Sequence, residues 1–161
     1  MKQTEIQETG QELQLVGFKL SDEQFGVEIL CVREIIRVVS ITRVPRAPGF
    51  VEGIINLRGE VIPVIDLRKR LNLEGREFDN STRLIVVELN DQQIGFIVDS
   101  VSQVLRVPAD AIEEPPEMVT GIDSEFILGV TRIDDGERLL LILDLKRILS
   151  QAEQVAMERV A

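Results

Sequence analysis

Residues 51–71 read VEGIINLRGEVIPVIDLRKRL. Two apolar runs rich in β-branched residues flank the turn-type segment LRGE, which predicts two strands joined as a β-hairpin. Pro63 lies in the second run and marks an edge strand or a bulge, because proline cannot donate to a sheet ladder. The stretch ends in DLRKRL (66–71), whose basic residues favour a short helix or turn. We therefore expect β-structure here, closed by a helical turn.

A second copy of this pattern lies further along the chain. The closing motif returns as DLKRIL (144–149), after the apolar runs FILGVTRI and RLLLILDL on either side of the turn signal DDGE. Five upstream residues recur with identical spacing at an offset of 69 residues: Gly26, Ile29, Val32, Ile35 and Ile36 correspond to Gly95, Val98, Val101, Val104 and Leu105. The chain thus contains an internal repeat of about five short strands, and a small barrel is the natural way to remove their edges.

The repeat predicts an all-β protein with two five-stranded barrel lobes, which share a core and enclose a cleft between them, because each lobe alone is small. We expect lobe one at about 13–80 and lobe two at about 81–149, with the first strand able to pack on the other lobe. A flexible leader (1–12), short helices and an amphipathic C-terminal helix or tail (150–161) complete the prediction. The run Phe25–Ile36 fits either a strand or a helix.

Composition narrows the function. The 161 residues include no His, one Cys, 28 acidic and 18 basic side chains, for a net charge of −10. Lack of His removes the usual general base and metal ligand, so we expect neither an enzyme nor a cofactor or metal protein. The acidic balance and scarce aromatics argue against nucleic acid. Cys31 is expected to be a small buried hydrophobe, and no signal peptide or membrane span is evident, which favours a cytoplasmic protein.

Two local features suggest protein recognition. Arginine supplies 14 of the 18 basic residues, and arginine is favoured at protein interfaces. Arg58 stands in the tight turn Asn56–Gly59, which aims its side chain either at a partner or into a structural salt bridge across the lobes. Val32, Glu34 and Ile35 form an apolar and acidic strip that could receive a partner helix, although core packing also accounts for Val32 and Ile35.

The motifs together resemble the CheW family of bacterial chemotaxis coupling proteins. The resemblance extends from about Leu13 to Leu149 and rests on GVEILCVREII, ITRVPRAPGFVEGIINLRGEVIPVIDLRKRL, IGFIVDSVSQVLRV, EPPE and DLKRIL. It implies two SH3-like five-stranded barrels. It also implies an adaptor that links the cytoplasmic tip of methyl-accepting chemotaxis receptors to the regulatory domain of the histidine kinase CheA, with other CheW copies as further partners and without direct membrane insertion.

The resemblance also assigns residues to partners. The positions that match the family's receptor-binding residues are Val32, Glu34, Ile35, Arg58, Gly95, Val101 and Val104. Those that match kinase-binding residues are Gly53 and Gly59, although glycine can act there through fold integrity alone.

Two other functions stay open at this stage. One is a CheW-like scaffold in a non-flagellar motility or biofilm pathway, which neighbouring genes would distinguish. The other is a small-molecule-binding β-barrel, for which the sequence supplies no perturbed acid or base in a pocket. A free-standing adaptor is favoured over the similar domain of CheA or a receiver fusion, because no ATP-binding or receiver segment precedes the motifs.

Overall fold

A computed structural model describes residues 12–115 and 126–149 of the chain. These residues form two five-stranded sheets with a few one-turn helices, which confirms the all-β class. Of the expected leader, only Glu12 is described, and it already begins the first strand. The expected C-terminal helix at 150–161 lies outside the described residues.

The first unit consists of residues 12–30 together with 101–115 and 126–148. Its strands are β1 (Glu12–Leu20), β2 (Glu23–Glu28), β8 (Ser100–Pro108), β9 (Ile127–Ile133) and β10 (Arg138–Leu143), in the order β8-β1-β2-β10-β9. The helical turns η2 (Ala109–Ala111), η4 (Asp134–Gly136) and α3 (Leu145–Ile148) follow β8, β9 and β10. Apolar residues of these strands (Leu15, Val107, Leu140 and Ile142) form one buried cluster with Ile112, which follows η2.

The second unit consists of residues 31–100 with Leu149. Its strands are β3 (Val32–Arg37), β4 (Val51–Leu57), β5 (Glu60–Asp66), β6 (Arg83–Leu89) and β7 (Gln92–Val98), in the order β3-β6-β7-β5-β4, with α2 (Leu67–Arg70) after β5. Its apolar cluster contains Ile55, Ile62, Val64, Leu84, Val86 and Ile97. The predicted hairpin at 51–66 is β4–β5, so this prediction is confirmed.

The two sheets have the same topology. If five is added to each strand number of the first sheet, and ten is subtracted from any sum above ten, the order β8-β1-β2-β10-β9 becomes β3-β6-β7-β5-β4, which is the order of the second sheet. Each unit therefore takes two strands from one repeat and three from the other. β1 lies in a sheet with strands of the second repeat, as the prediction allowed. β2 lies there too, so the two units differ from the expected bounds of 13–80 and 81–149.

The exchange of strands depends on the run Phe25–Ile36, whose sequence fits either a strand or a helix. β2 ends at Glu28, the 3₁₀ turn η1 (Ile29–Cys31) interrupts the chain, and β3 starts at Val32 in the other sheet. Leu30 in this turn is 91% exposed. Cys31 is only half-buried, which corrects its expected place in the core.

Equivalent aspartates begin the two short α-helices. The Arg68 backbone N–H donates to Asp66 Oδ1 (3.0 Å), and the Lys146 N–H donates to Asp144 Oδ1 (3.2 Å). The N–H groups of both aspartates donate to the carbonyl of a phenylalanine, Phe50 or Phe126, at 2.9 Å in each case. Burial raises the pKa of Asp66 above its ordinary value. The repeated Asp-Leu motif is thus an N-cap signature.

Pro63 does not mark an edge strand or a bulge. β5 lies between β4 and β7, and Pro63 pairs with Ile54 of β4 in regular register. The parallel ladder from β5 to β7 begins one residue later, at Val64. Proline is tolerated in this interior strand because the ladder on its second side has not yet started.

Candidate partner-binding site

The strand β3 lies at one end of the strand order of the second sheet, where β6 is its one partner among the described strands. Its register shifts between Val32 and Glu34, so the strand carries a bulge at Arg33. Bulges bend a strand and re-aim its side chains, and they are frequent at sheet edges near functional sites. Here the bulge brings Val32, Arg33 and Glu34 to the lining of one cavity.

The β4–β5 turn supplies the opposite side of this cavity. Leu57 pairs with Glu60, which leaves Arg58 and Gly59 as a two-residue loop with φ of 52° and 85°. Two positive φ values are typical of a type I′ hairpin turn. The Gly59 N–H donates to Asn56 Oδ1 at 3.0 Å. The turn therefore holds Arg58 in a backbone conformation that costs an ordinary residue about 1–2 kcal/mol.

Glu34 and Arg58 form an ion pair across the cavity. Arg58 Nη2 donates to Glu34 Oε2 at 2.6 Å, with the two side chains 70% (Arg58) and 27% (Glu34) exposed. The hydrogen bond that Arg58 donates to Glu34 raises the pKa of the Arg58 guanidinium above its ordinary value. Glu34 Oε1 is shielded from solvent and accepts no hydrogen bond from the described residues. The carboxylate thus has an unused acceptor, and the exposed guanidinium has unused donors.

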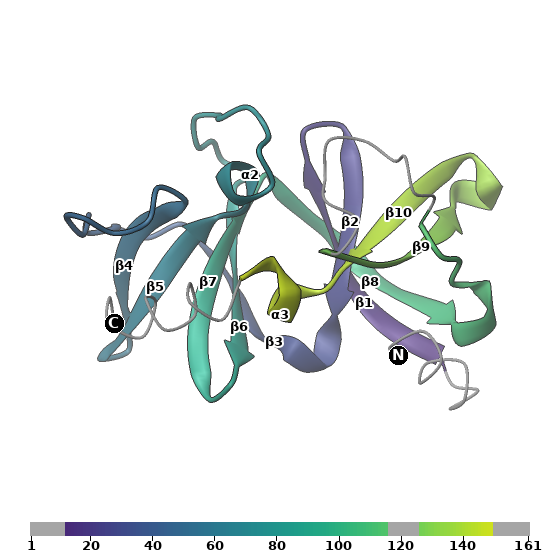
Figure 1. The fold of residues 1–161 in the computed structure, drawn as a ribbon, viewed down its shortest axis with the longest axis horizontal. Coiled ribbons are helices and arrows are strands. Elements are labelled where there is room, and N and C mark those ends of the chain that lie inside the picture. Colours follow the sequence, from purple (N-terminus) through teal and green to yellow (C-terminus); the bar gives the residue numbers. More distant parts are fainter. Residues whose placement is uncertain (1–11, 116–125, 150–161) are drawn as a thin grey trace. The chain divides into compact units, whose positions relative to one another are not determined.

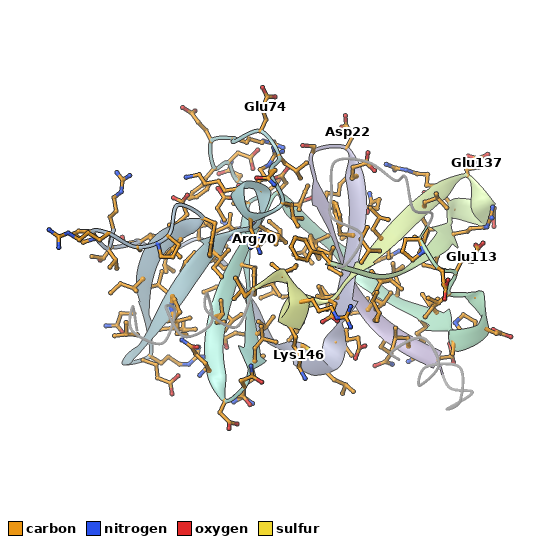
Figure 2. The ribbon with its side chains drawn as sticks, in the orientation of Figure 1. Asp22, Arg70, Glu74, Glu113, Glu137 and Lys146 are labelled. Carbon is orange, nitrogen blue, oxygen red and sulfur yellow. The ribbon has the colours of Figure 1, made fainter. Side chains whose placement is uncertain are left out.

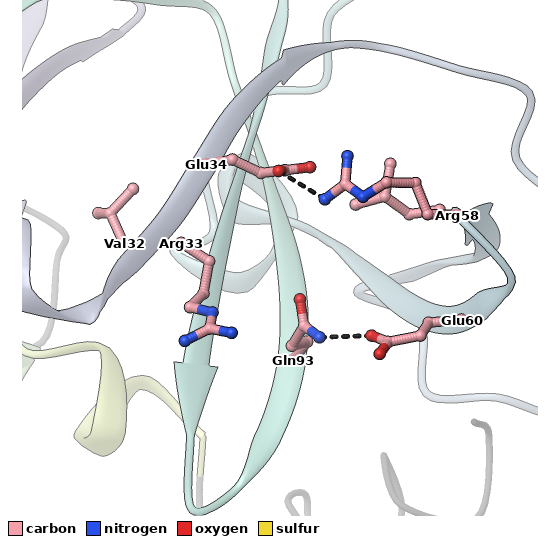
Figure 3. A pocket seen from close by; sticks show the side chains of 7 residues that line it. Val32, Arg33, Glu34, Arg58, Glu60 and Gln93 are labelled. Atoms are coloured by element: carbon pink, nitrogen blue, oxygen red, sulfur yellow. Dashed lines mark hydrogen bonds and ion pairs between the residues drawn. The ribbon is translucent and has the colours of Figure 1, made fainter.

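The cavity has a volume of about 540 Å³ and is lined by Val32, Arg33, Glu34, Leu57, Arg58, Glu60 and Gln93. Figure 3 shows the Glu34–Arg58 pair and, beside it, Gln93 Nε2 donating to Glu60 Oε2 at 2.5 Å. Two carboxylates and two guanidiniums give the lining no net charge. Such a surface complements a polar segment with both donors and acceptors, and Val32 and Leu57 supply apolar contact. We call it the Glu34–Arg58 cavity.

The structure brings some of the expected receptor-binding residues together and separates others. Val32, Glu34 and Arg58 line one cavity of the second unit, and the Arg58 salt bridge lies within that unit rather than across lobes. Ile35 is 39% exposed on the same strand but does not line the cavity.

The other expected receptor-binding residues have different surroundings. Val101 and Val104 lie on β8 of the first unit, where Val104 is 53% exposed. Gly95 is buried in β7, between β5 and β6, so this position offers no surface for direct contact.

The two expected kinase-binding glycines meet specific backbone needs. Gly59 occupies the second position of the type I′ turn, with open space where a Cβ would stand. Gly53 has φ of 153°, and a Cβ there would lie 2.2 Å from the Thr42 carbonyl oxygen. Gly53 therefore allows the segment at Thr42 to bridge to Ile54 beside β4. Glycine is therefore required at position 53 for the chain to adopt this fold.

Four lining residues were not singled out from the sequence as site residues: Arg33, Leu57, Glu60 and Gln93. Three of them could have been found from their sequence neighbours, because Leu57 and Glu60 flank the Arg58–Gly59 turn and Arg33 separates Val32 from Glu34. Gln93 carries no such signal, since only the pairing of β7 with β5 and β6 brings it near.

A second missed feature is the buried ion pair of Arg68, from α2, with Asp99, which follows β7. Arg68 Nε and Nη2 donate to the two Asp99 oxygens at 2.7 and 2.5 Å, and the side chains are 8% and 10% exposed. These bonds raise the pKa of Arg68. Arg68 Nη1 also donates to the Glu74 carbonyl oxygen (2.5 Å), while the Glu74 side chain points outward (Figure 2). Arg68 therefore fastens the loop after α2 to the sheet.

Replacing Arg58 by asparagine tests the backbone strain in the site. Asparagine tolerates the left-handed conformation and creates the favoured Asn-Gly turn. We expect Arg58→Asn to raise the Tm by about 2–4 °C, because relief of strain outweighs an ion pair that is largely exposed. Thermal unfolding followed by circular dichroism measures this. A lower Tm would show that the pair with Glu34 outweighs the strain.

In the described ranges, no group of three or more Cys, Asp or Glu side chains is placed to hold a metal ion. Nor does any helix within residues 12–115 and 126–149 have the length and apolar character needed to span a membrane.

Comparison with known proteins agrees with this architecture. Residues 14–153 match the family described as "CheW-like domain". The chain is 35% identical over 147 residues to "Chemotaxis protein CheW" of Treponema pallidum, covering 89% of this chain and 85% of that one. It is 35% identical over 144 residues to the protein of the same name in Klebsiella aerogenes, covering 89% and 86%. The crystal structure of scaffolding protein TtCheW from Thermoanaerobacter tengcongensis superposes with a TM-score of 0.79 at 41% identity, covering 86% and 88%.

Proposed function

The chain belongs to the CheW family of chemotaxis proteins, and we propose that it is a non-enzymatic adaptor that couples methyl-accepting chemotaxis receptors to the histidine kinase CheA. In this role the chain works in the cytoplasm, where it binds the cytoplasmic tip of the receptor and the regulatory domain of the kinase. Other copies of the chain are further partners in an array. The two SH3-like units supply separate surfaces for these contacts.

The observation that carries the proposal is the Glu34–Arg58 cavity. A receptor helix at this cavity can accept hydrogen bonds from the guanidinium donors of Arg58 that Glu34 leaves unused, and it can lie against the partly exposed side chain of Glu34. Both side chains are oriented before binding, Glu34 by the β3 bulge and Arg58 by the type I′ turn. Such preorganisation lowers the entropy cost of association. Apolar contact with Val32 and Leu57 completes a helix-in-groove mode of recognition.

The remaining expected residues take narrower roles in the proposal. Ile35 and Val104 are both exposed and are candidates for direct receptor contact. Val101 lies on β8 with Val104. Gly95 acts through the packing of β7 rather than by contact. For the kinase, we propose that Gly53 and Gly59 act by shaping the β4–β5 hairpin, whose exposed surface would make the contact.

The receptor contact is tested with a purified receptor-tip fragment. We expect a Glu34→Lys plus Arg58→Ala variant to bind the fragment about 10- to 100-fold more weakly, because both sides of the cavity lose their complementarity. Isothermal titration calorimetry measures the affinity. Unchanged affinity would remove the receptor site from this cavity.

The first unit offers a matched control. Arg132 Nε donates to Glu113 Oε2 at 3.0 Å, in an exposed ion pair of the same kind. The Glu113→Lys plus Arg132→Ala variant carries the same change of charge and is expected to bind the receptor fragment like the unaltered chain. Equal loss in both variants would indicate a general effect of charge.

A further inference from the structure

Three arginines near the β3–β4 connection have exposed side chains: Arg37, Arg43 and Arg46. We call residues 37–46 the arginine loop. Within the part of the chain that the structure describes, none of the three has an ion pair or a side-chain hydrogen bond. Four other arginines of this unit, namely Arg33, Arg58, Arg68 and Arg76, each pair with a carboxylate. Arg70 lies over the Phe50 ring, and Arg83 donates to backbone carbonyls. The guanidinium groups of the arginine loop are therefore available to a partner.

The backbone around the arginine loop is fixed at several points. Thr42 and Ile54 exchange two backbone hydrogen bonds of 2.8 Å, and the Val51 N–H donates to the Pro48 carbonyl oxygen at 2.9 Å. Pro45 further restricts the chain. Arg46 has φ of 67°, a conformation that an ordinary residue adopts only when its surroundings impose it. Figure 1 shows the connection projecting beyond β4 and β5. The arginines are thus held on a preorganised support.

The positive charge of the arginine loop contrasts with the acidic or balanced charge of the rest of the described chain. The described part of the first unit carries six basic and eleven acidic residues, and Asp22, Glu113 and Glu137 project from its surface (Figure 2). The second unit carries ten of each. A long polyanion or an anionic bilayer meets the repulsion of the whole chain, whose net charge is −10. A short acidic segment can contact the arginine loop without facing the charge of the whole chain.

We propose that the arginine loop is a second docking surface, which binds a short acidic segment of a protein partner through Arg37, Arg43 and Arg46. Guanidinium groups bind carboxylates in a bidentate manner, and they are less tightly hydrated than ammonium groups. The fixed backbone reduces the entropy lost on binding. This surface is distinct from the Glu34–Arg58 cavity, since the two share no residue, and it goes beyond the proposed receptor contact.

The proposal is tested with a fluorescent decaglutamate peptide, whose binding is followed by anisotropy at low and physiological salt. We expect the full chain to bind the peptide with an affinity that falls as salt rises. The triple variant Arg37→Glu, Arg43→Glu, Arg46→Glu is expected to bind at least about tenfold more weakly. The control variant Arg106→Glu, Arg138→Glu, Arg147→Glu makes the same change of charge on the first unit and is expected to remain within about threefold of the unaltered chain.

Each outcome decides the proposal. Selective loss in the loop variant supports it, whereas no binding by the unaltered chain or equal loss in both variants overturns it. Tighter loop-dependent binding of single-stranded DNA or of phosphatidylserine vesicles would also overturn it, since the partner would not be an acidic protein segment. The receptor-tip fragment separates this result from the proposed function, because the loop variant is expected to keep its affinity for that fragment.

Discussion

Gly53→Ala is expected to lower the free energy of unfolding by at least about 3 kcal/mol. The new Cβ would lie 2.2 Å from the Thr42 carbonyl oxygen and 2.8 Å from the Thr42 carbonyl carbon. These are backbone atoms, which cannot rotate away, and the Thr42–Ile54 bridge holds them in place. The φ of 153° adds strain for any residue with a Cβ. Urea denaturation followed by circular dichroism measures the loss.

Gly95→Ala is the matched control. It is the same substitution at another buried glycine of the same sheet, but its Cβ would meet its nearest neighbours at 3.7 Å, an ordinary contact. We expect a change of less than about 1 kcal/mol. If Gly53→Ala were as stable as Gly95→Ala yet failed to bind the kinase, Gly53 would be a contact residue rather than a structural one.

Arg68→Met is expected to cost about 3–5 kcal/mol of stability, because it leaves the nearly buried carboxylate of Asp99 without its bidentate partner. Methionine keeps much of the side-chain volume, so the loss reports charge and hydrogen bonds rather than a cavity. The loop after α2 should also loosen, since Arg68 Nη1 no longer binds the Glu74 carbonyl. Denaturation measures the first effect, and hydrogen exchange of the residues after α2 measures the second.

Arg76→Met serves as the control for Arg68. Arg76 belongs to the same network, with bonds to Asp79 (2.7 Å) and Asp99 (3.2 Å), but its side chain is 47% exposed. We expect a cost below about 1 kcal/mol. A second variant, Arg68→Met with Asp99→Leu, removes both charges and should recover much of the stability. Equal costs for Arg68→Met and Arg76→Met would contradict the structural role of the buried pair.

The positions of the strands could be predicted from the sequence more fully than the pairing of the strands in the sheets. Alternating apolar runs and turn signals such as LRGE and DDGE are local, and they identified β4, β5, β9 and β10. The repeat also predicted two equivalent five-stranded sheets. The exchange of strands between the repeats was not predictable in the same way. It follows from the one-turn interruption at Ile29–Cys31, which sends β2 and β3 into different sheets, and this stretch fits two periodicities.

In the candidate site, too, local features could be predicted from the sequence and long-range contacts could not. The turn geometry of Arg58 was readable from Asn56–Gly59, and the acidic and apolar strip around Glu34 was readable from residue types. Their pairing joins residues 24 positions apart and depends on the register of β3, including its bulge. Arg68 and Asp99 lie 31 positions apart, and nothing local to either residue distinguishes their buried pair from an exposed one. Long-range pairing, rather than residue type, decides these contacts.

An adaptor must hold the receptor tip and the kinase domain at the same time, and a three-component binding assay measures this. A receptor-tip fragment is immobilised, and retention of the purified CheA regulatory domain is measured with and without this chain. We predict that the kinase domain is retained only when the chain is present, in amounts that rise and saturate with it. Displacement of the chain from the receptor fragment by the kinase domain would show that the two partners compete, which would contradict an adaptor role.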